Sequence, residues 1–183
     1  MVKSLILCEG PNDIKFFALL CKYLECDKQV HIKKMDGKSN FFKTEKYDTT
    51  KQQVDTDQYH KVLLVVDADF VEYDANYGGF ENSTTQLNGM IQSLGFNDKA
   101  SIHIMCDPET KEGNLEHLIL STIDSKEKGC IESFLNCINP MNTCSNKKIV
   151  LSSYETIFKE EPYSFDHQNF DDIKSKITQM VNS

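Results

Sequence analysis

Short hydrophobic runs alternate along the chain with longer segments in which hydrophobic and polar residues are mixed. The first run, Ser4–Cys8, is followed by Glu9-Gly10-Pro11 and then by apolar residues at helical spacing. This order predicts a strand, a tight turn and a helix. Pro11 suits the first turn of that helix, where Asn12 or Asp13 can accept hydrogen bonds from the free backbone N–H groups.

The clearest element is the hydrophobic run Val62–Val66, which leads into Asp67-Ala68-Asp69. A continuous run of β-branched residues and leucines is typical of a strand buried on both faces, so we expect this strand at the centre of a sheet. Gly95 is expected to end a helix, because glycine accepts left-handed backbone. Further strands are predicted at 30–32, 101–106 and 148–151, and helices at 41–54, 84–94, 113–120, 126–138 and 171–181.

Alternating strands and helices predict an α/β fold with a Rossmann-like, mainly parallel sheet flanked by helices. We expect one domain over residues 1–183. One compact core is expected from this length, and because the pattern weakens past Asp124, about residues 123–183 are expected to form a C-terminal extension. The sequence contains no internal repeat or low-complexity tract that would favour another architecture.

The composition is that of a soluble globular chain, with 183 residues, 39% hydrophobic and 26% charged residues, and a mean hydropathy of -0.45. The hydrophobic runs are too short to cross a bilayer, and the run before Glu9 is too short for a signal segment. Seven cysteines form an odd set without C-x-x-C pairs, which predicts neither a disulfide framework nor a thiolate zinc site. We therefore expect a cytoplasmic protein with no membrane partner.

The net charge of -8 arises from 28 acidic residues and 20 basic ones, all of which are lysine. Arginine is the preferred bidentate reader of phosphate and guanine, so its absence disfavours sequence-specific DNA recognition. Residues 1–61 contain 11 lysines and 9 acids, whereas residues 62–183 contain 9 lysines and 19 acids. A nucleic acid is therefore expected to approach the first part of the chain or to be bridged by a metal ion.

Acidic residues follow two of the predicted strands, Glu9 after the first and Asp67 and Asp69 after the central one. Ligands of open parallel sheets bind beyond the carboxyl ends of the strands. Two-residue spacing puts Asp67 and Asp69 on one side of the chain if the strand continues that far. Such carboxylates are the hard oxygen ligands that Mg2+ needs while it keeps positions for water and phosphate. As ordinary structural residues they would instead be a helix-start acid and two turn-forming acids.

The motif Glu-Gly-x-x-Asp (Glu9, Gly10 and Asp13) after the first strand and the motif Asp-x-Asp (Asp67 and Asp69) after a later hydrophobic strand resemble the Toprim domain. This domain occurs in topoisomerases, bacterial primases, recombination-mediator proteins and OLD-type nucleases. The resemblance covers about residues 1–122. It implies phosphodiester chemistry that depends on Mg2+ or Mn2+, with Glu9 as metal ligand or general base and the paired aspartates as metal ligands. Asp13 is also a common helix-start residue.

Two shorter segments, Gly37-Lys38-Ser39-Asn40 and Gly113-Asn114-Leu115-Glu116, resemble small stand-alone and OLD-type Toprim proteins. The resemblance implies that Glu116 is an accessory catalytic acid near the metal and that Lys38 binds a phosphate. As ordinary residues, Glu116 would be a first-turn acid and Lys38 a solvated loop lysine. The chain shows no ATPase domain, primase zinc module or topoisomerase tyrosine domain, so we do not expect a complete topoisomerase or primase.

The leading hypothesis is a Toprim nuclease of the OLD type that cleaves DNA or RNA without sequence specificity and uses Mg2+ or Mn2+. A partner ATPase acting in trans and a homodimer are compatible with it. The alternative is a non-catalytic regulatory module that keeps the fold and binds metal or nucleic acid, which the acidic surplus and the absence of arginine favour. A third hypothesis, receiver-like phosphotransfer to Asp67, lacks the second acid expected beside Glu9.

Overall fold

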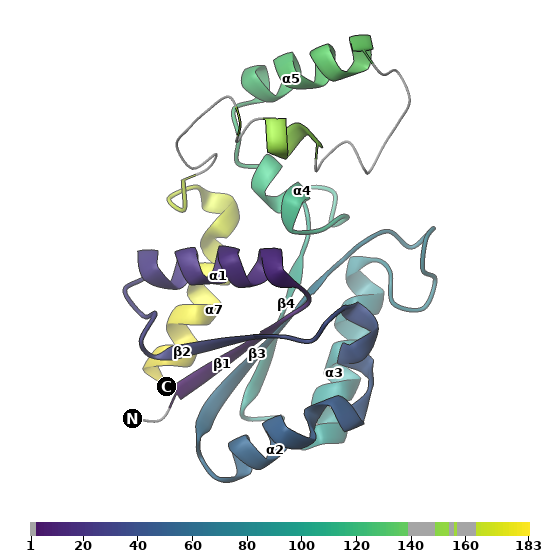
Figure 1. The fold of residues 1–183 in the computed structure, drawn as a ribbon. Coiled ribbons are helices and arrows are strands. Elements are labelled where there is room, and N and C mark those ends of the chain that lie inside the picture. The colour runs from purple at the N-terminus through teal and green to yellow at the C-terminus, as the bar shows by residue number, and fades with distance from the viewer. Residues whose placement is uncertain (1–2, 139–148, 154–155, 157–163) are drawn as a thin grey trace.

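Four parallel strands form one sheet in the described part of the chain, in the order β2-β1-β3-β4 (Figure 1). They are β1 (Lys3–Cys8), β2 (Val30–Lys34), β3 (Tyr59–Asp67) and β4 (Ala100–Met105). The parallel sheet with its flanking helices confirms the predicted α/β, Rossmann-like class. This computed structural model describes residues 3–138, 149–153, 156 and 164–183.

Helices cover both faces of the sheet (Figure 1). On one face lie α1 (Pro11–Tyr23) and α7 (Asp171–Asn182), and on the other lie α2 (Asp48–Asp55) and α3 (Phe80–Leu94). None of the helices in the described ranges is both long and apolar enough to cross a bilayer. Further elements are the 3-10 helices η1 (Lys38–Phe42), η2 (Thr44–Tyr47) and η3 (Gln168–Phe170), and the α-helices α4 (Leu115–Leu120) and α5 (Ser125–Ile138).

The central strand β3 is buried on both faces, which confirms the prediction from its hydrophobic run. Leu63 and Val65 pack in the core cluster that contains α1 and α7. Val62, Leu64 and Val66 pack in the other cluster, which contains α2 and α3. Alternate side chains of one strand therefore supply both cores, and this strand fixes the position of the residue at its end.

The C-terminal helix α7 is part of the core. Its buried residues Ile173, Ile177 and Met180 belong to the same cluster as α1. The Ser4 hydroxyl of β1 donates a hydrogen bond to the Met180 carbonyl oxygen at 2.8 Å. The predicted helix at 171–181 is thus confirmed, and within the expected C-terminal extension it completes a layer over the sheet.

Two predicted elements differ from the structure. The predicted helix at 41–54 is divided into η1, η2 and α2, with extended backbone angles at Lys43 (φ -119°, ψ 110°). The break lets Phe41 and Tyr47 both turn inward, where the Tyr47 hydroxyl donates to the Phe41 carbonyl oxygen at 2.9 Å. The predicted strand at 148–151 is wrong for residues 149–151, which are helical and bury Val150, while residue 148 lies outside the described ranges. A short apolar run does not by itself distinguish a strand from a buried helix.

The winding of the sheet reverses between β1 and β3. From β1 the chain passes through α1 to β2, whereas β3 lies on the other side of β1 and is followed by α3 on the opposite face. Where two neighbouring strands lead to helices on opposite faces, a crevice opens at their carboxyl ends. Glu9, directly after β1, and Asp67, the last residue of β3, both lie at this crevice.

Candidate functional site

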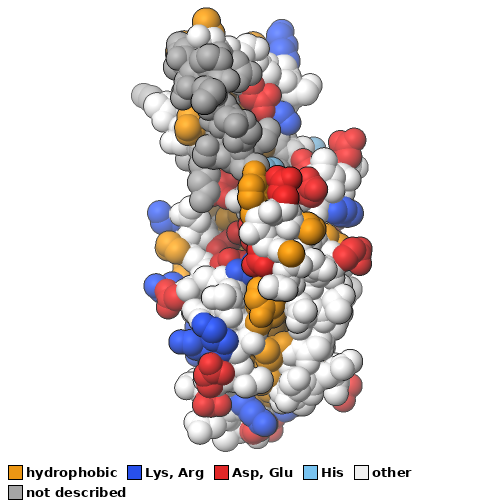
Figure 2. All heavy atoms as spheres, turned by 90° about the vertical axis from the view of Figure 1, so that its right-hand side faces the viewer, with side chains coloured by type: hydrophobic (Ala, Val, Ile, Leu, Met, Phe, Trp, Pro, Cys, Tyr) orange, Lys and Arg blue, Asp and Glu red, His pale blue; other side chains and the backbone are white. Residues whose placement is uncertain are grey.

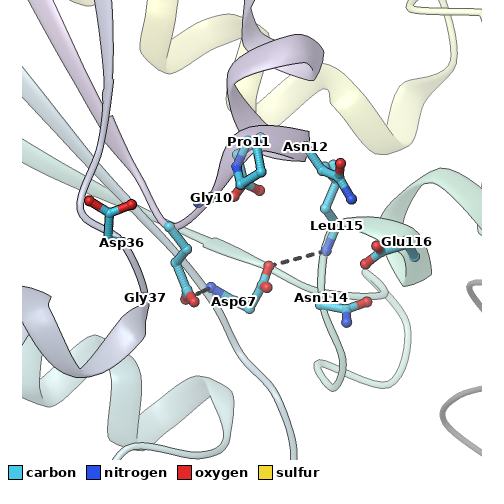
Figure 3. A pocket seen from close by; sticks show the side chains of 11 residues that line it. Gly10, Pro11, Asn12, Asp36, Gly37, Asp67, Asn114, Leu115 and Glu116 are labelled. Carbon is cyan, nitrogen blue, oxygen red and sulfur yellow. Dashed lines mark hydrogen bonds between the residues drawn. The ribbon is translucent and has the colours of Figure 1, made fainter.

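An acidic cavity of about 440 Å³ opens at the carboxyl edge of the sheet (Figure 3). Four segments line it: the start of α1, the loop after β2, the end of β3 and the start of α4. None of the described lining residues is basic, so the cavity is suited to attract a cation. The acids that line it are Glu9, Asp13, Asp36, Asp67 and Glu116.

Glu9 joins the ends of the two central strands. Its Oε1 atom accepts a hydrogen bond from the Asp67 backbone N–H at 2.8 Å. The pKa of Glu9 is raised to about 7, mainly by burial, with the charges of Asp69 and Asp13 acting in the same direction and the Asp67 N–H and Lys38 acting against it. A carboxyl group with this pKa can take up or release a proton near neutral pH.

Asp67 connects β3 to the start of α4. Its Oδ1 atom accepts a hydrogen bond from the Leu115 backbone N–H at 3.1 Å. Burial raises the pKa of Asp67 well above its usual range, and the nearby charge of Glu9 is the next largest cause. Two carboxyl groups that disfavour each other's ionisation in one crevice would both be stabilised as anions by a bound cation.

Asp13 and Glu116 bring two further carboxyl groups to the cavity from the first turns of α1 and α4. Asp13 Oδ2 accepts a hydrogen bond from the Gly10 backbone N–H at 2.7 Å, which fixes the turn between β1 and α1. Glu116 is 9% exposed, and its carboxylate points towards that of Asp67 in Figure 3. The charges of both residues raise the pKa of Asp67, so the structure brings the predicted accessory acid into the same electrostatic cluster.

A tight turn positions the start of α4 against β3. Gly113 has a φ of +92°, and a Cβ atom there would lie 2.3 Å from the His117 ring, so the position requires glycine. Asn114 follows as the helix cap, with its Oδ1 accepting a hydrogen bond from the His117 backbone N–H at 3.4 Å. This turn aims the Leu115 N–H at Asp67 and the Glu116 side chain at the cavity.

Asp69 is placed differently from the other predicted site residues. The strand ends at Asp67, and Asp69 has a left-handed φ of +56°, so the extended geometry on which a shared side depends does not continue to Asp69. Two hydrogen bonds with Gly113 hold the Asp69 backbone, from its N–H to Gly113 O at 2.6 Å and from the Gly113 N–H to Asp69 O at 3.2 Å. Asp69 does not line the cavity.

Lys38 also lies apart from the cavity lining. Its Nζ atom donates to Asp67 O at 2.6 Å, to Ala68 O at 2.9 Å and to Asp69 Oδ2 at 3.1 Å. The side chain is 12% exposed. Lys38 therefore binds the turn that follows β3, whereas the family resemblance implies a lysine that faces a phosphate.

Sequence reasoning did not single out Asp36 or the Leu115 N–H. Asp36 lies shortly after β2 and lines the cavity, as Glu9 does after β1, so the rule that parallel strands end at one edge could have found it. The Leu115 N–H is a backbone group, and its contact with Asp67 depends on how α4 packs. Every residue except proline has a backbone N–H, so the identity of residue 115 does not predict this hydrogen bond.

The residues fit a hydrated divalent ion better than a fully protein-ligated one. Among the described residues, no three His, Cys, Asp or Glu side chains are close enough together to hold a metal ion. Mg2+ usually keeps several waters and is bound through one or two carboxylates. Glu9 and Asp67 each use one oxygen in a backbone hydrogen bond, so the second oxygen of each carboxylate can face an ion in the cavity.

Comparison with known proteins gives the family of the chain. A family model described as "Protein of unknown function (DUF3226)" matches residues 3–155, so the chain belongs to the DUF3226 family. This range contains all five acids of the cavity and ends before α7. No curated protein and no solved structure matches the chain.

Proposed function

We propose that this protein hydrolyses phosphodiester bonds in nucleic acid with Mg2+ or Mn2+, as a nuclease similar to the OLD-type Toprim enzymes. One observation carries this proposal: Glu9 and Asp67, at the ends of two central strands, are joined by a hydrogen bond in an open cavity lined by acids. The cavity lies where open parallel sheets bind their ligands. The resemblance of the two motifs to Toprim supplies the reaction type.

In this proposal the second oxygens of Glu9 and Asp67 hold the ion, and Glu116 is placed to bind its waters. A bound divalent ion would neutralise charge on the phosphate and lower the pKa of water. With the second oxygen of Glu9 bound to the ion, the proton of the attacking water would pass to Glu116, whose carboxylate lines the same cavity. The resulting hydroxide adds to phosphorus, the bond between phosphorus and the leaving sugar oxygen breaks, and that oxygen takes up a proton from solvent.

The charge distribution favours a substrate that is held weakly and without sequence recognition. The chain has no arginine, and the described residues that line the cavity include no lysine. On the face shown in Figure 2, lysine side chains lie interspersed with acidic ones. A partner ATPase acting in trans, or a second copy of the chain, would add the surface needed to hold the nucleic acid firmly. We place this activity in the cytoplasm, which the free cysteines among the described residues support.

Cleavage assays test the proposal directly. Single-stranded, nicked and duplex DNA and RNA are incubated with the full chain and Mg2+ or Mn2+, and Glu9→Gln and Asp67→Asn are compared with wild type. Each variant removes a carboxylate ligand of the proposed ion, and we expect each to lower the cleavage rate by about 10²–10⁴, the range that follows loss of a catalytic acid or base. The matched controls Glu45→Gln and Asp55→Asn change exposed acids on η2 and α2 and should retain activity. Equal rates for wild type and both site variants, with folding intact, would reject the assigned roles.

A second candidate function is a regulatory module that binds metal or nucleic acid without cleaving it. The observation that favours it is the placement of Asp69, which leaves the cavity with fewer converging carboxylates than the Asp-x-Asp motif suggests. This candidate predicts that Mn2+ raises the melting temperature through the Asp67 site while no substrate is cleaved. Metal-dependent turnover that Asp67→Asn abolishes would exclude it.

A further inference from the structure

The Lys38 ammonium group occupies an oxygen-lined position at the turn that follows β3. Its three hydrogen atoms have three acceptors: the carbonyl oxygens of Asp67 and Ala68 and the Asp69 carboxylate, at 2.6, 2.9 and 3.1 Å. Only 12% of the side chain is exposed. The contacts therefore form a partly buried cation site that the chain fills with its own lysine, with the Asp69 side chain 43% exposed.

The backbone around this ammonium is held in place from several directions. The Ala68 carbonyl oxygen also accepts a hydrogen bond from the Gly79 N–H at 2.8 Å, and the Ala68 N–H donates to Met105 O at 2.8 Å. Asp69 forms its paired hydrogen bonds with Gly113. To turn its carboxylate into the cavity, Asp69 would have to break the contact with Lys38, while its backbone stays held in a left-handed conformation by these bonds.

We propose that Lys38 is a positioning residue that keeps Asp69 out of the cavity and so limits the site to a single divalent ion, held by Glu9 and Asp67. The inference rests on the proposed function, because it concerns the same metal site. A second ion bound to Asp69 would have to displace a buried ammonium from three oxygen atoms. The second ion would also bring two positive charges close to the first ion, which Glu9 and Asp67 hold. In a partly buried region this repulsion is unfavourable.

The number of bound ions distinguishes this arrangement from a two-metal site. Mn2+ is titrated into the full chain, and free Mn2+ is counted by electron paramagnetic resonance to give ions bound per chain and their affinity. We expect one ion for wild type, a Kd within about threefold of wild type for Asp69→Asn, and a loss of at least about tenfold in affinity for Asp67→Asn. The Asp69→Asn change leaves an amide oxygen that can still accept a hydrogen bond from Lys38.

Lys38→Met supplies the complementary test, because methionine keeps much of the side-chain volume and removes the charge. We expect this variant to bind a second Mn2+ ion, while Lys51→Met, which changes an exposed lysine on α2, still binds one. If Lys38→Met does not fold, the comparison of Asp69→Asn with Asp67→Asn decides the question without it.

The outcomes separate this inference from the proposed function. Two ions bound by wild type, or equal losses of affinity in Asp69→Asn and Asp67→Asn, would overturn the role of Lys38 and leave metal-dependent cleavage intact. One bound ion with no cleavage of any nucleic acid would support the role of Lys38 and remove the nuclease proposal. No binding of Mn2+ by wild type would overturn both.

Discussion

Replacing Glu9 by glutamine should make the folded chain more stable at pH 8 without metal. Burial raises the pKa of Glu9 from 4.5 to about 7, so the folded state holds a proton that the unfolded state has released between these values. The contribution of Glu9 to the free energy of unfolding is therefore fully present below pH 4.5, and it is lost as the pH rises to about 7. At about 1.4 kcal/mol for each pH unit, the ionised Glu9 side chain costs the folded state about 3 kcal/mol at pH 8.

Glutamine keeps an oxygen that can accept from the Asp67 N–H, and it removes the charge. It also removes the largest charge effect on Asp67, which lowers the pKa of that neighbour and acts in the same direction. The difference in unfolding free energy between Glu9→Gln and wild type should therefore grow by about 3 kcal/mol between pH 4.5 and pH 8.

Urea unfolding in the presence of a chelator, at several pH values across this window, measures the difference. Glu45→Gln is the control, because its side chain is exposed and should leave the difference from wild type independent of pH. Saturating Mn2+ should reverse the advantage of Glu9→Gln at pH 8, because the ion stabilises only a site that retains its ligand. A difference that stays constant from pH 4.5 to pH 8 would refute the burial and charge repulsion assigned to Glu9.

Three further substitutions test the framework that holds the site. Leu64→Ala should cost about 2–5 kcal/mol of unfolding free energy in chemical denaturation, because it opens a cavity in the core. Gly113→Ala should destabilise the chain and weaken Mn2+ binding, because its Cβ would meet the His117 ring at 2.3 Å; unchanged Mn2+ affinity would contradict this role of the turn. Tyr47→Phe should cost about 1–3 kcal/mol by leaving the buried Phe41 carbonyl oxygen without its donor, and a cost near zero would show that the bond is dispensable.

The sequence predicted the parallel sheet and the proximity of Glu9 and Asp67 because both depend on strong local patterns. The run Val62–Val66 has no polar residue, so it fits only a position buried on both faces, and β3 occupies that position. Once two strands are parallel neighbours, the residues at their carboxyl ends must lie at one edge. Glu9 and Asp67 therefore meet as a consequence of strand order.

The rest of the site depends on contacts between distant segments, which local patterns do not encode. The backbone of Asp69 pairs with Gly113 and its carboxylate contacts Lys38, which reaches this turn from the segment after β2. The spacing of two residues predicts a shared side only while the strand continues. Similarly, the break at Lys43 depends on the burial of Phe41 and Tyr47 in one core, which is a tertiary property.

The most direct measurement of the central claim is a crystal structure of the full chain soaked with Mn2+, with data collected at a wavelength where manganese scatters anomalously. The account predicts one anomalous peak in the acidic cavity, with carboxylate oxygens of Glu9 and Asp67 as its protein ligands and Lys38 still bound to Asp69. A cavity without a peak, or an ion bound through Asp69 in place of Lys38, would contradict it.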